Sequence, residues 1–219
     1  MKHLARGISI VFHPLWMASY VLVACMLINP YLFGVQDTQS RSVILISVFL
    51  LSFFFPVLSI LMMKALGLIK SLEMKERSER IGPMIATGIF YLWLYLNIRS
   101  NTVIPGAYTF FVLGAVIAMF VAFFINTFDK ISLHALGAGG LLTAMLIIGS
   151  QFSYGSFLLQ VHQGLVVQVN ILLVYVITIL ISGLTLTSRL ILNAHTQKQL
   201  YGGFLLGVFS QLIAYFVIS

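Results

Sequence analysis

The residues best suited to chemistry lie between positions 188 and 199, in a polar stretch that separates two long apolar runs. This stretch reads Ser-Arg-Leu-Ile-Leu-Asn-Ala-His-Thr-Gln-Lys-Gln. Arg189 and His195 are costly at a membrane boundary unless an anion or a watery cavity meets them. His195 and Gln199 are four residues apart and would share a helix face, with Asn193 as a candidate N-cap. The stretch indicates a polar site for an anionic ligand, although Arg189 alone would also suit a helix C-terminus.

A second polar cluster, residues 126–134, contains another histidine and another cation. Lys130 and His134 would share a face if one helix included both. Ser132 lies where the next helix is expected to begin, and exposed backbone N–H groups at a helix start favour anions. Each feature also has a structural explanation, with Lys130 as an interfacial anchor and His134 as a hydrogen-bonded interior residue. The glycines of the next turn would let another helix approach closely; they are Gly137, Gly139 and Gly140.

A third cluster, residues 71–83, is the only run of charges in the chain. Its acidic and basic side chains are spaced four apart, which would stabilise a short exposed helix. A solvated connector is therefore the simplest interpretation of this stretch taken alone. Lys75 and Arg80 become candidate ligand-binding cations only if the stretch lies beside the other two clusters. Pro83 suits the start of the helix that follows.

The composition shows which elements must position these residues. The chain has 219 residues, of which 60% are hydrophobic and 8% charged, and its mean hydropathy is +1.07. Soluble domains carry about a quarter charged residues, so we expect a polytopic membrane protein. The single cysteine, Cys25, excludes an intramolecular disulfide and disfavours a cysteine-based metal site. The net charge of +7 is better explained by membrane topology and anionic headgroups than by nucleic acid.

The hydropathy pattern predicts an all-α bundle of six or seven transmembrane helices in a single domain, residues 1–219. A spanning helix needs about 20 apolar residues. The third candidate run is short and could be tilted, re-entrant or joined to the fourth. His13-Pro14 lies near the start of the first helix, where we expect a packed or interfacial histidine. The first run is too long for a signal peptide and is interpreted as a retained helix. The runs are about 8–33, 42–66, 82–97, 105–126, 133–150, 166–187 and 200–218.

Topology then predicts that the three polar clusters meet. An even number of helices separates each cluster from the next, so all three reach the same membrane face. All Lys and Arg residues except Arg41 and Arg99 fall on that face, which the positive-inside rule assigns to the cytoplasm. We expect the inner membrane of a bacterium. Two histidines with several cations and helix N–H groups favour a phosphate site, in which histidine can act as nucleophile and proton donor.

These residues resemble the motifs of the type 2 phosphatidic acid phosphatase superfamily. Ser188-Arg189, His195 and Gln199 have the spacing of its third motif, Ser-Arg-x5-His-x3-Asp, with Gln199 in place of the aspartate. Ser132 and His134 match two residues of the second motif, Pro-Ser-Gly-His. Lys75 begins a match to the first motif, Lys-x6-Arg-Pro, in which Arg80 lies two residues before the expected arginine. The resemblance covers roughly residues 70–219, with additional spans at about 8–66.

The resemblance implies an integral membrane lipid phosphatase that uses no metal and no cofactor. His195 would be the nucleophile that forms a phosphohistidine, and His134 the acid that protonates the leaving alcohol. The phosphoryl oxygens would be held by Arg189, Arg80, Lys75 and Ser132, with Lys130 beside them. Gln199 can accept the His195 Nδ1–H bond but supplies no negative charge to the imidazolium. The implied substrates are phosphatidate, phosphatidylglycerophosphate or a polyprenyl diphosphate, held in the bilayer by their tails.

Two other functions remain open at this stage. The first is a catalytically impaired relative that binds or carries anionic lipid, which the glutamine at position 199 and the incomplete first two motifs favour. The second is a small-molecule transporter, although no pair of inverted repeats is visible. The pattern predicts no nucleic-acid partner, and it leaves the oligomeric state undetermined.

Overall fold

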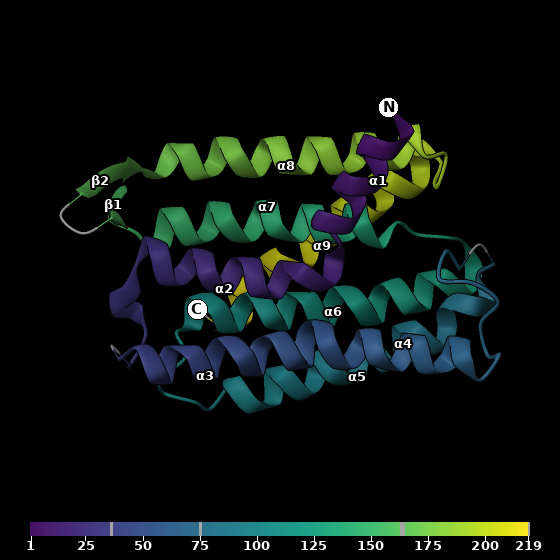
Figure 1. The fold of residues 1–219 in the computed structure, drawn as a ribbon, viewed down its shortest axis with the longest axis horizontal. Coiled ribbons are helices and arrows are strands. Elements are labelled where there is room, and N and C mark those ends of the chain that lie inside the picture. Colours follow the sequence, from purple (N-terminus) through teal and green to yellow (C-terminus); the bar gives the residue numbers. More distant parts are fainter. Residues whose placement is uncertain (36, 75, 163–164, 219) are drawn as a thin grey trace.

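The computed structural model describes residues 1–35, 37–74, 76–162 and 165–218. Within these ranges, seven helical stretches are long and apolar enough to cross a membrane. They lie side by side in one bundle (Figure 1), which confirms the expected all-α architecture. The third stretch, predicted to be short, is a full helix of 21 residues. The uninterrupted helices are α5 (Ser78–Ile98), α6 (Gly106–Phe128), α7 (Leu133–Gln151), α8 (Ile171–Ile191) and α9 (Gln197–Ile218).

The first stretch is broken at His13-Pro14. Helix α1 (Lys2–Val11) ends there, a 3-10 turn covers Pro14–Trp16, and α2 (Met17–Ile28) continues into the bundle. Proline has no backbone N–H and cannot extend a helix from the preceding turn. The His13 side chain caps the turn by accepting a hydrogen bond from the Leu15 N–H. As a result α1 is inclined to α2 and packs against α8 (Figure 1).

The second stretch is continuous but contains a π-helical turn, Leu50–Phe54, between α3 (Thr38–Phe49) and α4 (Phe55–Ala65). Pro56 lies one turn later and offers no N–H to the carbonyl groups before it, which favours a wider turn at this point. Asp37 caps the start of α3, where its carboxylate accepts the Ser40 N–H at 2.8 Å.

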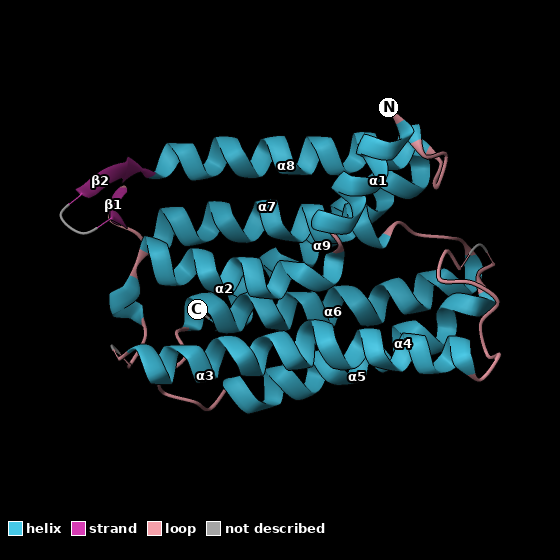
Figure 2. Cartoon of the chain, viewed as in Figure 1, coloured by secondary structure: helices cyan, strands magenta, loops and turns pink. Residues whose placement is uncertain are grey.

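The only sheet in the described residues is a two-stranded antiparallel hairpin, β1 (Ser156–His162) and β2 (Leu165–Asn170). It projects from one end of the bundle (Figure 2). The sixth apolar run was predicted to be helical from residue 166, and this boundary is wrong. Residues 165–169 are apolar except for Gln168 and include three β-branched valines, so hydropathy does not distinguish a strand from a helix there. The helix starts at Ile171 because the Asn170 side chain accepts the Leu172 N–H.

Helices α7 and α9 form the centre of the site-bearing part of the bundle. A methyl group on Gly139 would overlap the Phe204 carbonyl, and one on Gly207 would overlap the Leu136 carbonyl. A methyl group on Gly203 would lie 2.6 Å from the Ser132 carbonyl oxygen. The expectation that glycines allow close helix approach is therefore confirmed for Gly139. The backbone contact brings the start of α7 next to the start of α9.

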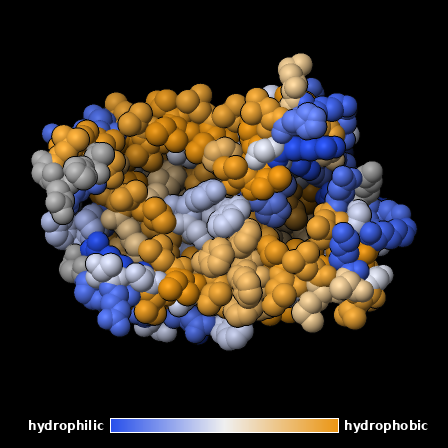
Figure 3. Space-filling view, viewed as in Figure 1, coloured by the Kyte–Doolittle hydropathy of each residue, from blue (hydrophilic) through white to orange (hydrophobic). Residues whose placement is uncertain are grey.

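Apolar and hydrophilic residues occupy separate parts of the surface, as a membrane-spanning bundle requires. On the face shown in Figure 3, apolar residues form a broad middle belt and hydrophilic residues gather at the two ends. One end carries the N-terminus and the connections α4–α5, α6–α7 and α8–α9 (Figure 1). These connections contain the three polar clusters, so the fold brings them to one end of the bundle.

Candidate functional site

A pocket of about 940 Å³ opens at this end of the bundle. Its size is near the upper limit of the roughly 300–1,000 Å³ usual for ligand sites, so it could hold more than a phosphate ion. The outer wall carries cations from four elements, and the inner wall is mainly apolar. The polar lining residues that matter for the argument are Arg6, His13, Arg80, Lys130, His134, Arg189 and His195.

His195 lies in the connection between α8 and α9 and is held by Gln199. Its Nδ1 is 3.2 Å from the Gln199 Oε1. The same oxygen accepts the Thr196 N–H at 3.3 Å, which identifies it as the amide oxygen. An oxygen can only accept here, so His195 carries its proton on Nδ1. Its Nε2 is therefore the atom with a free lone pair.

The pKa of His195 is lowered from 6.5 to about 4, first by burial. The hydrogen bond to Gln199 raises it, while the positive charges of Arg80, Arg189 and Lys130 lower it further. Each of these cations disfavours a second proton on the ring. His195 is thus a neutral imidazole at pH 7, and three cations lie close enough to affect it.

Asn193 does not have the predicted N-cap role for α9. It has a φ of +51° and terminates α8, with the Ala194 N–H bonded to the Arg189 carbonyl at 3.1 Å. Asparagine tolerates this left-handed conformation better than most residues, which suits a helix C-terminus. The start of α9 is instead capped by Thr196, whose Oγ1 accepts the Gln199 N–H at 3.4 Å. The two caps together place His195 between the helices.

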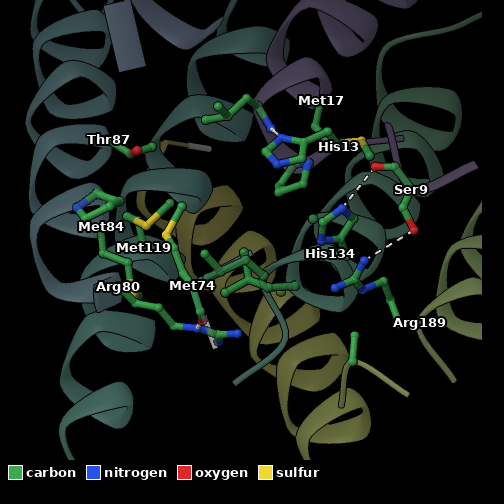
Figure 4. Close-up of a pocket in the computed structure, with 18 of the residues that line it drawn as sticks. Ser9, His13, Met17, Met74, Arg80, Met84, Thr87, Met119, His134 and Arg189 are labelled. Carbon is green, nitrogen blue, oxygen red and sulfur yellow. Dashed lines mark hydrogen bonds between the residues drawn. The ribbon is translucent and has the colours of Figure 1, made fainter. Parts of the chain in front are cut away.

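Arg189 and Arg80 approach the pocket from opposite walls (Figure 4). Arg189 donates from Nη1 to the Ser9 hydroxyl at 3.4 Å, and its buried Nε has no hydrogen-bond partner among the described residues. Arg80 donates from Nε to the Met74 carbonyl at 3.1 Å. It also donates from Nη1 to the Ile131 carbonyl at 3.1 Å, so it ties the third polar cluster, residues 71–83, to the second, residues 126–134.

Lys130 and His134 both line the pocket, but not for the predicted reason. Helix α7 begins at Leu133, so Lys130 precedes it and shares no helix face with His134. The His134 Nε2 is 3.0 Å from the Ser9 carbonyl oxygen. A carbonyl can only accept, which places the His134 proton on Nε2 and leaves Nδ1 as an acceptor.

Of the predicted site residues that the structure describes, two do not line the pocket. Ser132 is fully buried and its hydroxyl accepts the Ala135 N–H at 3.3 Å, as the N-cap of α7. Gln199 acts behind His195, and its Nε2 is 3.5 Å from Asp129 Oδ1. Lys75 lies outside the described residues.

The charged stretch before α5 also differs from expectation. Its described residues form turns rather than an exposed helix, and α5 begins at Ser78. Glu79 fastens this connection by accepting the Lys70 N–H at 2.9 Å and the Glu76 N–H at 3.3 Å. Lys70 and Glu76 form an ion pair of 2.9 Å, whereas the expected i,i+4 pairing of Lys75 lies outside the described residues. Packing of Arg77 against the end of α6 explains the difference, because its guanidinium donates to the Phe128 carbonyl.

The N-terminal helix contributes residues that the sequence did not assign to the site. Arg6, Ser9 and His13 line the pocket. The only local signal was His13-Pro14, since a histidine fixed before proline has a restricted backbone. Nothing in the spacing of Ser9 indicates its contacts, because its partners lie more than 120 positions away.

No three His, Cys, Asp or Glu side chains of the described residues are grouped as metal ligands. The pocket instead offers guanidinium and ammonium groups, which suit an anionic ligand. No model of a known protein family matches this chain, and no curated protein or solved structure is similar to it. The class of protein that fold and site define is an integral membrane bundle with a cationic, histidine-containing pocket.

Proposed function

We propose that this protein is a membrane-embedded lipid phosphatase that works through a phosphohistidine without a metal. The observation that carries the proposal is the pairing of His195 with Gln199 beside Arg80, Arg189 and Lys130. This pairing leaves a neutral Nε2 lone pair next to the cations that would hold a phosphoryl group. A nucleophilic histidine held in place by the hydrogen bond that it donates to its partner is the arrangement that covalent catalysis requires.

In the proposed first step, the His195 Nε2 bonds to phosphorus and the bond from phosphorus to the leaving oxygen breaks. His134 in its protonated form gives its Nδ1 proton to that oxygen, while its Nε2–H stays on the Ser9 carbonyl. Water then attacks the phosphohistidine, and His134 takes a proton from it as the P–N bond breaks. The cations stabilise the negative charge that develops on the phosphoryl oxygens.

A lipid substrate is favoured by the composition of the pocket. Beyond the cationic mouth, its lining is mainly apolar and includes Met84, Phe111 and Met119. A soluble phosphate ester would leave this surface in contact with water, whereas an alkyl or isoprenoid chain would cover it. The proposed substrates are therefore phosphatidate, phosphatidylglycerophosphate or a polyprenyl diphosphate.

The test measures phosphate release by purified protein from each of these three lipids with EDTA present. We expect release from at least one of them, and we expect His195→Ala to abolish it. His3→Ala is the matched control, because His3 is exposed on α1 and does not line the pocket. A folded wild-type protein that releases no phosphate from any of the three would refute the proposal.

A second candidate function is binding or carriage of an anionic lipid without turnover. The neutral amide of Gln199 favours it, because an amide cannot offer the negative charge that an aspartate would give to an imidazolium. Labelled phosphate trapped on His195 after brief mixing with substrate would establish the enzyme. Tight lipid binding with no covalent label would establish the carrier.

A further inference from the structure

The two site histidines assigned so far present no N–H group to a bound anion while both are neutral. His134 uses its Nε2–H on the Ser9 carbonyl, at 3.0 Å. His195 uses its Nδ1–H on the Gln199 amide oxygen, at 3.2 Å. Each therefore faces the pocket with a lone pair, which repels phosphoryl oxygens. In this neutral state, a histidine N–H donor to the anion has to come from another ring, in addition to the guanidinium of Arg189 on the same side of the pocket.

His13 has the complementary arrangement. Its Nδ1 accepts the Leu15 N–H at 3.3 Å, so the neutral ring carries its proton on Nε2. No described residue forms a hydrogen bond with that Nε2. The ring lies edge-to-face with His134, with centroids 5.0 Å apart and an angle of 84°. Both rings lie on the same wall of the pocket, across from Arg80 (Figure 4).

The position of His13 is fixed by local and by distant contacts. Its backbone is extended, with φ −67° and ψ 139°, as expected for a residue before proline. Pro14 packs against Gly137, where a methyl group would lie 3.2 Å from the Pro14 Cβ. On the other side of His13, the Ser9 hydroxyl lies 3.0 Å from the Ser188 hydroxyl and binds α1 to α8.

We propose that His13 is a third substrate-contacting histidine, which donates its Nε2–H to an oxygen of the bound phosphate group. The α1 segment then belongs to the site itself, although it lies outside the stretch that carries the phosphatase-like spacing. This inference rests on the proposed function for the identity of the ligand. The hydrogen bond is to a charged acceptor, so its loss should weaken transition-state binding about ten- to a hundred-fold.

The test compares His13→Leu, which removes the donor, with His13→Gln, whose amide N–H can lie near the position of Nε2. His3→Leu, in α1, is the control, because His3 is exposed and does not line the pocket. We expect His13→Leu to lower kcat/KM about ten- to a hundred-fold, and His13→Gln to recover most of that loss. His3→Leu should match the wild type, and the two His13 variants, which both lose the cap on the Leu15 N–H, should unfold in detergent at temperatures similar to each other.

Two outcomes would overturn the inference: wild-type kcat/KM in His13→Leu, or equal losses in the Leu and Gln variants. A second readout separates this inference from the proposed function. Binding of inorganic phosphate, measured as the rise in unfolding temperature, needs no turnover. If the wild type hydrolyses no lipid, the enzyme proposal fails, but a phosphate-dependent rise that His13→Leu loses and His3→Leu keeps would still support the His13 contact.

Discussion

At the scale of single residues, Gln199 is the side chain on which the chemistry depends most. Its Oε1 fixes the tautomer of His195, and its Nε2 reaches toward Asp129 at 3.5 Å. A carboxylate at this position would hold the same tautomer and add a negative charge next to Nδ1–H. Glutamine and glutamate have nearly the same length, so the substitution Gln199→Glu changes the charge at this position and little else.

The pH dependence of turnover reports on this residue. The pKa of His195 is about 4, below the ordinary 6.5, because of burial and the neighbouring cations. Its neutral, nucleophilic form is therefore fully present at pH 7 and is lost only as the pH falls toward 4. In Gln199→Glu the added negative charge favours the imidazolium and raises the pKa of His195, so the acidic limb of log kcat/KM should move to higher pH. Phosphate release measured from pH 4 to 8 tests the shift.

We also expect Gln199→Glu to raise kcat at pH 7 about ten-fold. Gln199→Leu should lower kcat, whereas the control His3→Leu should leave it at the wild-type value. The wild type and Gln199→Glu bind the same substrate, so ionisation of the substrate phosphate affects both pH profiles equally. Superimposable profiles for wild type and Gln199→Glu would show that Gln199 does not control His195.

At the scale of secondary-structure elements, the contact between α7 and α9 aligns the two histidine-bearing segments. Helix α9 presents Gly203 and Gly207, one turn apart, to the backbone of α7. This is the small-xxx-small pattern by which membrane helices approach closely. His134 lies on the first turn of α7, and His195 just precedes α9. Any increase in the distance between the helices therefore separates the proposed nucleophile from the proposed acid.

Two alanine substitutions in α9 test this contact. Gly207→Ala places a methyl group against the Leu136 carbonyl, whereas Gly202→Ala meets no atom within 4 Å. Overpacking typically costs about 1–3 kcal/mol, so Gly207→Ala should unfold at a lower temperature and lose phosphate release. Gly202→Ala should be neutral or slightly stabilising, by up to about 1 kcal/mol, because alanine favours helix. Equal unfolding temperatures in detergent would count against this packing role.

At the scale of the whole molecule, the distribution of charge predicts how the protein lies in the membrane. Apart from Arg41 and Arg99, every Lys and Arg of the sequence falls on the site side of the predicted topology. The positive-inside rule places that end in the cytoplasm. The proposed substrate would then be presented by the inner leaflet, and the β1–β2 hairpin would face the opposite side.

Cysteine labelling in intact cells tests this orientation. The natural Cys25 is fully buried and should give little background. A membrane-impermeant thiol reagent should label Tyr154→Cys, since Tyr154 is 87% exposed beside the hairpin. It should leave Glu76→Cys unlabelled until the membrane is permeabilised. Labelling of Glu76→Cys in intact cells, with Tyr154→Cys protected, would reverse the assignment.

The sequence alone determined the architecture and the sidedness of the polar clusters. The apolar runs predict six or seven transmembrane helices because a bilayer requires both length and hydropathy, and the described residues form seven. Helix counting then brings His134, Arg189 and His195 to one end, and the i,i+4 spacing anticipates the bond between His195 and Gln199. These are properties of local sequence and of alternation across a membrane, and neither needs a tertiary contact.

Only the tertiary structure decided which side chains line the pocket and which stabilise the helix ends next to it. Ser132 and Asn193 are used as a helix cap and a helix stop, because backbone groups at helix ends must be satisfied first. Ser9 and His13 enter the pocket because the break at Pro14 lets α1 incline against α8. Contacts between residues more than 100 positions apart leave no periodic trace in a single sequence, so no reading of spacing could have assigned them.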